Sequence, residues 1–268
     1  MILLTLIAIL CYVLCHTFEM ASFGSRVAGR ITNRAALGTT LSQTVYTTAD
    51  FILILFLPTL GYIVESGITI NDYLIIVLAA YILTFIVSIV MIIKLNSLQQ
   101  FYQVIFAKYK DNTIPIAILK SLINKKTDLN VKDCNDFTFD KVILKKTLVS
   151  SLAYLFLVTG FFNAFMLALL FPENRLTVSG FTAAFHGFGA VIFAFYLDPM
   201  LSRSIDNYSD DIVWLKNVYS ILLGRALSYF AIIILLSVFL QLRSLNILSC
   251  DYLLENNSLR LLELLCFY

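Results

Sequence analysis

Long apolar runs separated by short polar segments make up most of the chain. Six of them reach or approach the roughly 20 residues that a helix needs to cross a bilayer core. The cleanest run covers residues 73–95, where the only charged residue is Lys94 near its end. We expect transmembrane helices at residues 1–18, 35–64, 73–95, 147–171, 177–197 and 214–242. The pattern predicts an all-α polytopic membrane protein with about six transmembrane helices, in one membrane domain spanning residues 1–268.

The composition supports a membrane protein and argues against a soluble one. Hydrophobic residues make up 60% of the chain and charged residues 13%, against about 45–50% and 25% in soluble domains. So few charges could not cover the surface of a soluble fold of this size. The formal net charge of +2 gives no reason to expect a nucleic-acid partner; membrane lipids are the expected surroundings.

Basic residues alternate between the two sides of the expected membrane. The connections after the first, third and fifth runs carry fifteen Lys and Arg, whereas the other side carries only Arg175, Arg243 and Arg260. Loops rich in Lys and Arg remain in the cytoplasm. Both termini are therefore predicted to lie outside. The first apolar run precedes its arginines, which favours an uncleaved helix over a signal peptide.

Two segments are expected to lie outside the membrane spans. Residues 96–146 form a basic connection, predicted to be cytoplasmic, whose first part mixes apolar residues with lysines as an amphipathic helix on a membrane surface does. The tail, residues 243–268, is rich in Leu and is expected to form an interfacial helix.

Ionisable side chains at bilayer depth are costly, so they mark candidate functional positions. Glu19, Arg26, Arg30 and Arg34 fall within one arc of a helix, with His16 close to the same face. Guanidinium groups bind phosphate oxygens through paired hydrogen bonds. The three arginines are therefore predicted to bind an anion with several oxygens; the alternative is that they only fix the topology.

The second expected span begins with an unusual density of hydroxyl and amide groups. So many polar side chains are not expected on a surface that faces lipid, so we expect them to line a wet cavity. The residues concerned are Thr39, Thr40, Ser42, Gln43, Thr44, Thr47, Thr48 and Asp50. Those predicted to bind substrate are Thr40, Gln43, Thr44 and Thr47.

Four charged residues are predicted to balance one another or to couple transport to an ion. They are Glu19, Asp50, Asp198 and Arg225. Arg225 lies inside the sixth expected span and needs a partner there, which could be Asp50 or Glu19.

The six spans permit an inverted repeat of three plus three helices, as in many transporters. Arg34 and Pro58 are separated by the same interval as Arg175 and Pro199. A repeat would make the second and fifth helices the pair that lines the substrate path.

Several chemistries lack their motifs. The sequence has no GxxxxGK[ST] loop for ATP, and its two histidines, His16 and His186, lack the spacing of a zinc site. We therefore expect no metal, no cofactor and no catalytic residue. Cys250 and Cys266 could pair if they face an oxidising compartment, and the sequence leaves this open.

The runs SRVAGRITNRAALGTTLSQ, FLPTLGYIVE and YLDPMLSRSIDN resemble the Amj family of bacterial lipid II flippases, which are alternates to the unrelated MurJ flippase. The resemblance covers most of the chain, from the arginine-rich connection to the Asp-Pro end of the fifth helix. It implies a protein of the bacterial cytoplasmic (inner) membrane that moves lipid II, an undecaprenyl diphosphate, to the outer leaflet during peptidoglycan and cell-wall biogenesis.

On this resemblance, Arg26, Arg30 and Arg34 would hold the diphosphate and the Thr/Ser face would solvate the sugars. Two other classes remain open. One is a membrane enzyme, a phosphatase or transferase, acting on a polyprenyl diphosphate lipid. The other is a structural or regulatory membrane protein. The oligomeric state and the energy source stay open.

Overall fold

The computed structural model describes residues 1–123, 142–207 and 211–244, and these residues form helices and connections without a strand. The prediction of an all-α multi-pass membrane protein is confirmed, because six helical stretches are long and apolar enough to cross a membrane. The elements are α1 (Ile2–Ile31), α2 (Ala35–Glu65), α3 (Ile70–Ile93), α4 (Leu95–Lys108), α5 (Ile114–Ile123), α6 (Leu144–Leu170), η2 (Pro172–Asn174), α7 (Arg175–Ser179), α8 (Phe181–Ile192), η3 (Phe193–Leu197), α9 (Asp198–Asn207) and α10 (Asp211–Ser244).

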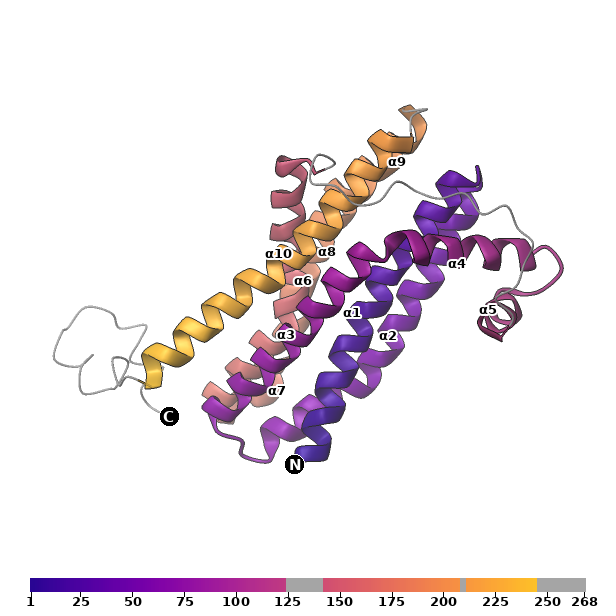
Figure 1. The fold of residues 1–268 in the computed structure, drawn as a ribbon. Helices are drawn as coiled ribbons and strands as arrows, with labels where there is room; N and C mark the ends of the chain where they lie inside the picture. Colours follow the sequence, from indigo (N-terminus) through magenta and orange to yellow (C-terminus); the bar gives the residue numbers. More distant parts are fainter. Residues whose placement is uncertain (124–141, 208–210, 245–268) are drawn as a thin grey trace.

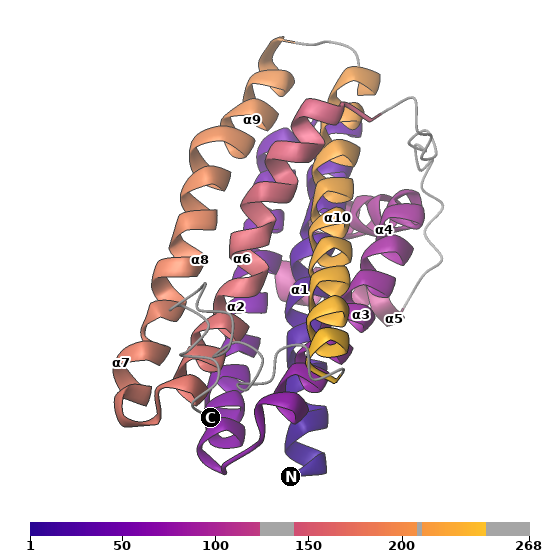
Figure 2. The ribbon, with the colours of Figure 1, turned by 90° about the vertical axis from the view of Figure 1, so that its left-hand side faces the viewer.

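The six spans are α1, α2, α3, α6, the run from η2 to α9, and α10. Helices α1 and α2 form an antiparallel hairpin, α3 packs on α1 and α10, and α6 lies between α10 and α8. The start of α1 and the end of α10 lie at one end of the bundle, and the α1–α2 turn and α9 lie at the other (Figure 1). The run α7–α9 forms an outer arm beside α6 (Figure 2).

Helix α1 is longer than its apolar run and carries Arg26 and Arg30 on its last turns. It ends in a tight turn at Asn33, whose φ of 57° is a left-handed conformation that Asn tolerates well. The backbone N–H of Arg34 then donates to Gly29 O at 2.7 Å. The arginines that the sequence places in a connection therefore lie on a helix and its cap.

Two glycines let α1 and α2 touch backbone to backbone beside this turn. A Cβ added at Gly38 would lie 2.8 Å from both Gly29 Cα and Ser25 O. The Ser25 hydroxyl also donates to Gly38 O at 2.9 Å, which joins the two helices at this point.

We expect Gly38→Ala to lower the free energy of unfolding by about 1–3 kcal/mol, because backbone atoms must move to admit the methyl group. Thermal unfolding of the purified protein in detergent would measure the loss. Gly187→Ala on α8 is the matched control, since nothing lies within 4 Å of its added Cβ. Equal melting temperatures for the two variants would contradict the close approach.

Helices α4 and α5 occupy the first part of the basic connection, where one amphipathic helix is expected. Helix α4 crosses the α1–α2 hairpin sideways (Figure 1) and packs against α1. Tyr102, Ile105 and Phe106 of α4 pack with Ala28 and Leu41 from the hairpin. The rest of the connection and the Leu-rich tail, with Cys250 and Cys266, lie outside the described residues, and the membrane-surface location stays a prediction.

An aromatic cluster fills the half of the bundle nearest the start of α1. Tyr12 packs against Phe162 and Tyr81, with ring centroids 4.7 and 5.7 Å away, and Phe56 joins at 5.7 Å from Phe162. The hydroxyls of Tyr12 and Tyr81 both donate to Val158 O, at 3.0 and 3.2 Å. This half of the bundle is therefore closed by rings from α1, α2, α3 and α6.

The predicted inverted repeat stays a prediction. Arg34 and Arg175 each stand at the start of a helix, as a repeat requires. Pro58, however, lies inside α2, whereas Pro199 is the second residue of α9, directly after the π-helical turn η3.

Candidate functional site

A polar cavity of about 190 Å³ lies among α1, α2, α6, α8 and α10, with η3 and α9 beside it. Four charged residues line it, Glu19 and Arg26 from α1, Asp198 from α9 and Arg225 from α10. The remaining polar lining consists of hydroxyl, amide and imidazole groups, from His16, Ser22, Ser42, Gln43, Tyr46, Tyr154 and His186.

The cavity lies among helices that are long and apolar enough to cross a membrane. His16 and Arg26 both line it, and because they are ten positions apart on α1, they are separated by about 15 Å along the helix, half of a typical bilayer core. Beyond His16 the bundle is closed, because Tyr12 stacks edge-on against the imidazole with ring centroids 4.3 Å apart. The cavity therefore occupies the half of the bundle that the charge distribution assigns to the cytoplasm.

Arg225 is the centre of a buried ion pair at the inner end of the cavity. Its side chain is 1% exposed, and its Nη2 contacts the Glu19 carboxylate directly. Its guanidinium carbon lies 4.7 Å from the ring centroid of Tyr154, and its Nε donates to the Tyr229 hydroxyl at 3.3 Å. Glu19 is thus the partner of Arg225, and Asp50 is not.

His16 completes this cluster with one nitrogen shared between two partners. Its Nδ1 lies 2.9 Å from Glu19 Oε2 and 2.7 Å from Arg225 Nη2. A ring nitrogen either donates or accepts, so Nδ1 can donate to Glu19 or accept from Arg225 but not both. The Nε2 atom is buried without a hydrogen-bond partner among the described residues. One proton can therefore take two positions on this ring.

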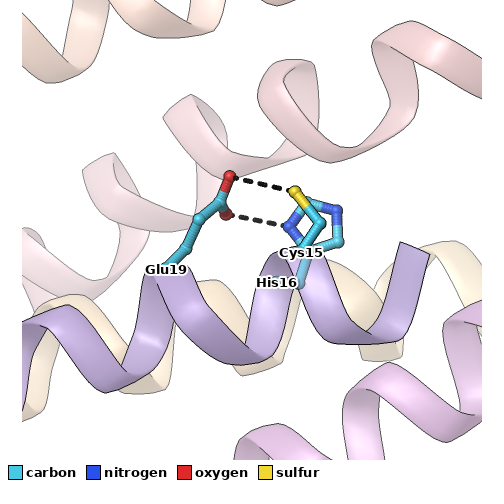
Figure 3. Close-up of side chains that lie close together, drawn as sticks. All are labelled: Cys15, His16 and Glu19. Atoms are coloured by element: carbon cyan, nitrogen blue, oxygen red, sulfur yellow. Dashed lines mark hydrogen bonds and ion pairs between the residues drawn. The ribbon is translucent and has the colours of Figure 1, made fainter. Parts of the chain in front are cut away.

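Cys15, His16 and Glu19 bring a thiol, an imidazole and a carboxylate together on adjacent turns of α1 (Figure 3). The Cys15 thiol donates to Glu19 Oε1 at 3.8 Å. Such ligands suit a transition metal. Here the Arg225 guanidinium already contacts both the Glu19 oxygen and the His16 nitrogen. The positive charge in this cluster is therefore supplied by the protein itself.

Arg26 links two elements at the mouth of the cavity. Its Nη1 donates to Asp198 Oδ1 at 2.8 Å, and its Nε donates to the Ser42 hydroxyl at 3.2 Å. The side chains of Arg26 and Asp198 are 19% and 41% exposed, so this pair is accessible where the Glu19–Arg225 pair is not. The Arg26–Asp198 bridge ties α1 to the outer arm.

The other two arginines of the predicted stripe do not line the cavity. Arg34 is the residue directly before α2, and its Nη1 donates to the backbone oxygen of Phe106 on α4 at 3.3 Å. Arg30 is partly buried on α1, one turn beyond Arg26. The structure thus brings Arg26 together with Arg225 in one cavity rather than with Arg30 and Arg34.

The threonine face of α2 forms an open groove of about 880 Å³ next to the cavity. It is lined by Ala36, Thr39, Thr40, Gln43, Thr44, Thr47, Thr48 and Phe51. Gln43 lines both the groove and the cavity, so the two spaces adjoin. Asp50 is exposed on the same helix but lines neither.

Four threonines of this face donate to their own helix. The hydroxyls of Thr39, Thr40, Thr44 and Thr48 donate to the carbonyl four residues earlier, at 2.9–3.1 Å. This bonding lowers the cost of exposing a hydroxyl to lipid, and it leaves each oxygen as a hydrogen-bond acceptor. The groove therefore offers acceptors in a row, which suit the hydroxyls of a sugar or another donor-rich head group.

Several lining residues were not predicted from the sequence, chiefly Tyr46 and Tyr154. Their hydropathy merges with the apolar runs, and only the fold brings Tyr154 of α6 to Arg225 of α10. His186 is half-buried, with Nδ1 3.3 Å from Leu157 O, and it lines the cavity.

Comparison of the chain with protein-family models, curated proteins and solved structures found no match. The fold and the site therefore define the class by themselves: this is a multi-pass α-helical membrane protein with a charged cavity among its spanning helices.

Proposed function

We propose that this chain is a flippase that carries the head group of a polyprenyl diphosphate lipid across the membrane, and that lipid II is its substrate. The observation that supports a lipid carrier best is the pairing of a charged cavity with an adjoining groove on the outer face of α2. A lipid head group needs both, because its tail must remain in the bilayer while its polar part enters the protein.

Each part of the proposed substrate has a matching surface. The diphosphate would bind Arg26, displacing Asp198 from the guanidinium, since a phosphate oxygen accepts the same paired hydrogen bonds as a carboxylate. The sugars would lie along Thr40, Gln43, Thr44 and Thr47, which line the groove. The tail would remain against the lipid-facing side chains of the outer arm, such as Phe188 and Phe195.

The buried cluster is the proposed coupling element. A polyprenyl diphosphate is an anion whose charge must be balanced inside the protein, and the Glu19–Arg225 pair with His16 can redistribute one proton in response. Without an ATP motif, the driving force would come from an ion gradient, the membrane potential or removal of the product outside.

To test this proposal, the amount of lipid II exposed on the outer face is measured in a bacterium depleted of its own flippase. Expression of the wild-type chain is expected to restore exposure, whereas cells with an empty vector stay low. Unchanged low exposure with correctly inserted protein would refute the flippase. The enzyme alternative is tested separately, because a phosphatase or transferase would convert labelled polyprenyl diphosphate in purified form, and a flippase would not.

The threonine groove gives a further prediction. We expect Thr40→Val with Thr44→Val to change the free energy of unfolding by less than about 0.5 kcal/mol, because these are exposed surface positions. Lipid II exposure should nevertheless fall, since two acceptors for the head group are lost. Thr17→Val on α1 is the matched control, because its hydroxyl makes the same bond to Val13 O and lines neither space. Equal exposure in both variants would exclude a role for the groove.

A further inference from the structure

A second cavity, of about 310 Å³, lies at the opposite end of the bundle from Arg26. It is formed by the α2–α3 connection, the start of α3, the end of α6 with η2, and the end of α10. Its lining residues run from Gly67 to Asn71, together with Leu169, Pro172, Arg175 and Arg243.

Two arginines from distant parts of the sequence meet in this cavity. They are two of the three basic residues on the side that the charge distribution places outside, where arginines are otherwise rare. Among the residues that the structure describes, no carboxylate lines the cavity. Neither arginine forms an ion pair with a carboxylate in the described ranges. Arg175 Nε is buried and has no hydrogen-bond partner there.

The start of α3 adds to the positive field. Ile70 and Asn71, the first two residues of this 24-residue helix, line the cavity. The N-terminal end of a helix carries partial positive charge and free N–H groups, which bind phosphates. The one acidic residue of this turn, Asp72, does not line the cavity, and its carboxylate accepts from the Thr69 hydroxyl at 2.7 Å.

From these observations we infer that Arg175, Arg243 and the start of α3 form a binding site for a phosphate or diphosphate group at the outer end of the protein. An arginine that only reached toward the lipid head groups would keep its Nε hydrated, whereas Arg175 Nε is buried. The inference rests on the proposed function for its role, since a cationic site at this end would receive the diphosphate of a lipid that the protein has carried across. The anion could be the substrate's diphosphate or the phosphate of an anionic membrane lipid.

Labelling of a cysteine placed in the cavity tests the site. Asn71→Cys is made in full-length protein whose Cys134, Cys250 and Cys266 are replaced by Ser; Cys11 and Cys15 are buried and can stay. The reaction rate with a negatively charged thiol reagent is measured in phosphatidylcholine vesicles, without and with inorganic diphosphate. Ser66→Cys, exposed in the same connection, is the matched control.

We expect diphosphate, at about ten times its dissociation constant, to slow labelling at position 71 about tenfold by occupying the site. The rate at position 66 should not change, and Arg175→Gln or Arg243→Gln should remove the protection. If 20% phosphatidylglycerol in the vesicles protects and diphosphate does not, the ligand is a lipid phosphate, and the reverse result identifies a diphosphate.

If neither anion protects position 71 from labelling in folded protein, the proposed anion site is refuted. That outcome would leave the flippase proposal standing, because restoration of lipid II exposure is measured independently in cells. Conversely, protection in a protein that fails to restore exposure would support the anion site alone.

Discussion

Replacement of Arg225 by Met is expected to lower the free energy of unfolding by about 3–5 kcal/mol, because it leaves a buried carboxylate without its partner. Glu19 is 7% exposed, and its Oε2 contacts Arg225 and lies 2.9 Å from His16 Nδ1. Thermal unfolding in detergent measures the loss. Arg203→Met is the matched control, since Arg203 is exposed and its replacement should change stability by less than about 0.5 kcal/mol.

The double variant Arg225→Met with Glu19→Gln separates charge from packing. We expect it to recover most of the lost stability, because a neutral amide costs far less to bury than an ion. A single Arg225→Met variant as stable as the wild type would show that the pair is not formed. A double variant no more stable than the single one would show that Arg225 acts through its packing on Tyr154 instead.

Replacement of Arg26 by Gln is expected to reduce lipid II exposure about ten- to hundredfold at matched expression. The loss corresponds to one charge-assisted hydrogen-bonding group, worth about 1.5–3 kcal/mol. Arg26→Lys is the discriminating variant. It keeps the positive charge but loses the planar pair of donors. A diphosphate site therefore predicts reduced lipid II exposure, whereas a purely topological role predicts unchanged exposure.

Asp198→Asn is expected to strengthen the binding of a diphosphate lipid, whereas Arg26→Gln is expected to weaken it. The carboxylate competes with an anionic head group for Arg26, so its neutralisation is expected to tighten the binding of a short-chain polyprenyl diphosphate to purified protein. Its removal also frees the outer arm from α1. Weaker binding in this variant would contradict the exchange of Asp198 for the substrate.

The spans of this fold were predictable because each apolar run is long enough to specify a membrane helix by itself. The ends of the helices were less predictable than their positions. The first run was expected to end near Phe18, but α1 continues to Ile31. The polar second half of the helix is buried against other helices, which hydropathy along one segment does not reveal.

The sequence predicted candidate residues of the site but not which of them lie together. Glu19 and Arg225 stand out as charges at bilayer depth, but they are 206 residues apart, and only the packing of α1 on α10 makes them a pair. The spacing of the arginines indicated one stripe, whereas the left-handed turn at Asn33 directs Arg34 toward α4. The sequence also does not say whether a threonine hydroxyl bonds water or its own helix.

The shared carbonyl of Val158 has a consequence for the electrical insulation of the membrane. Two tyrosine hydroxyls donate to this oxygen, and the rings of Tyr12, Tyr81 and Phe162 pack together beyond His16. A continuous file of water through a membrane protein would let protons cross the bilayer. The packed aromatic rings occupy this part of the bundle, so the charged cavity can open to one side while the opposite half stays filled by side chains.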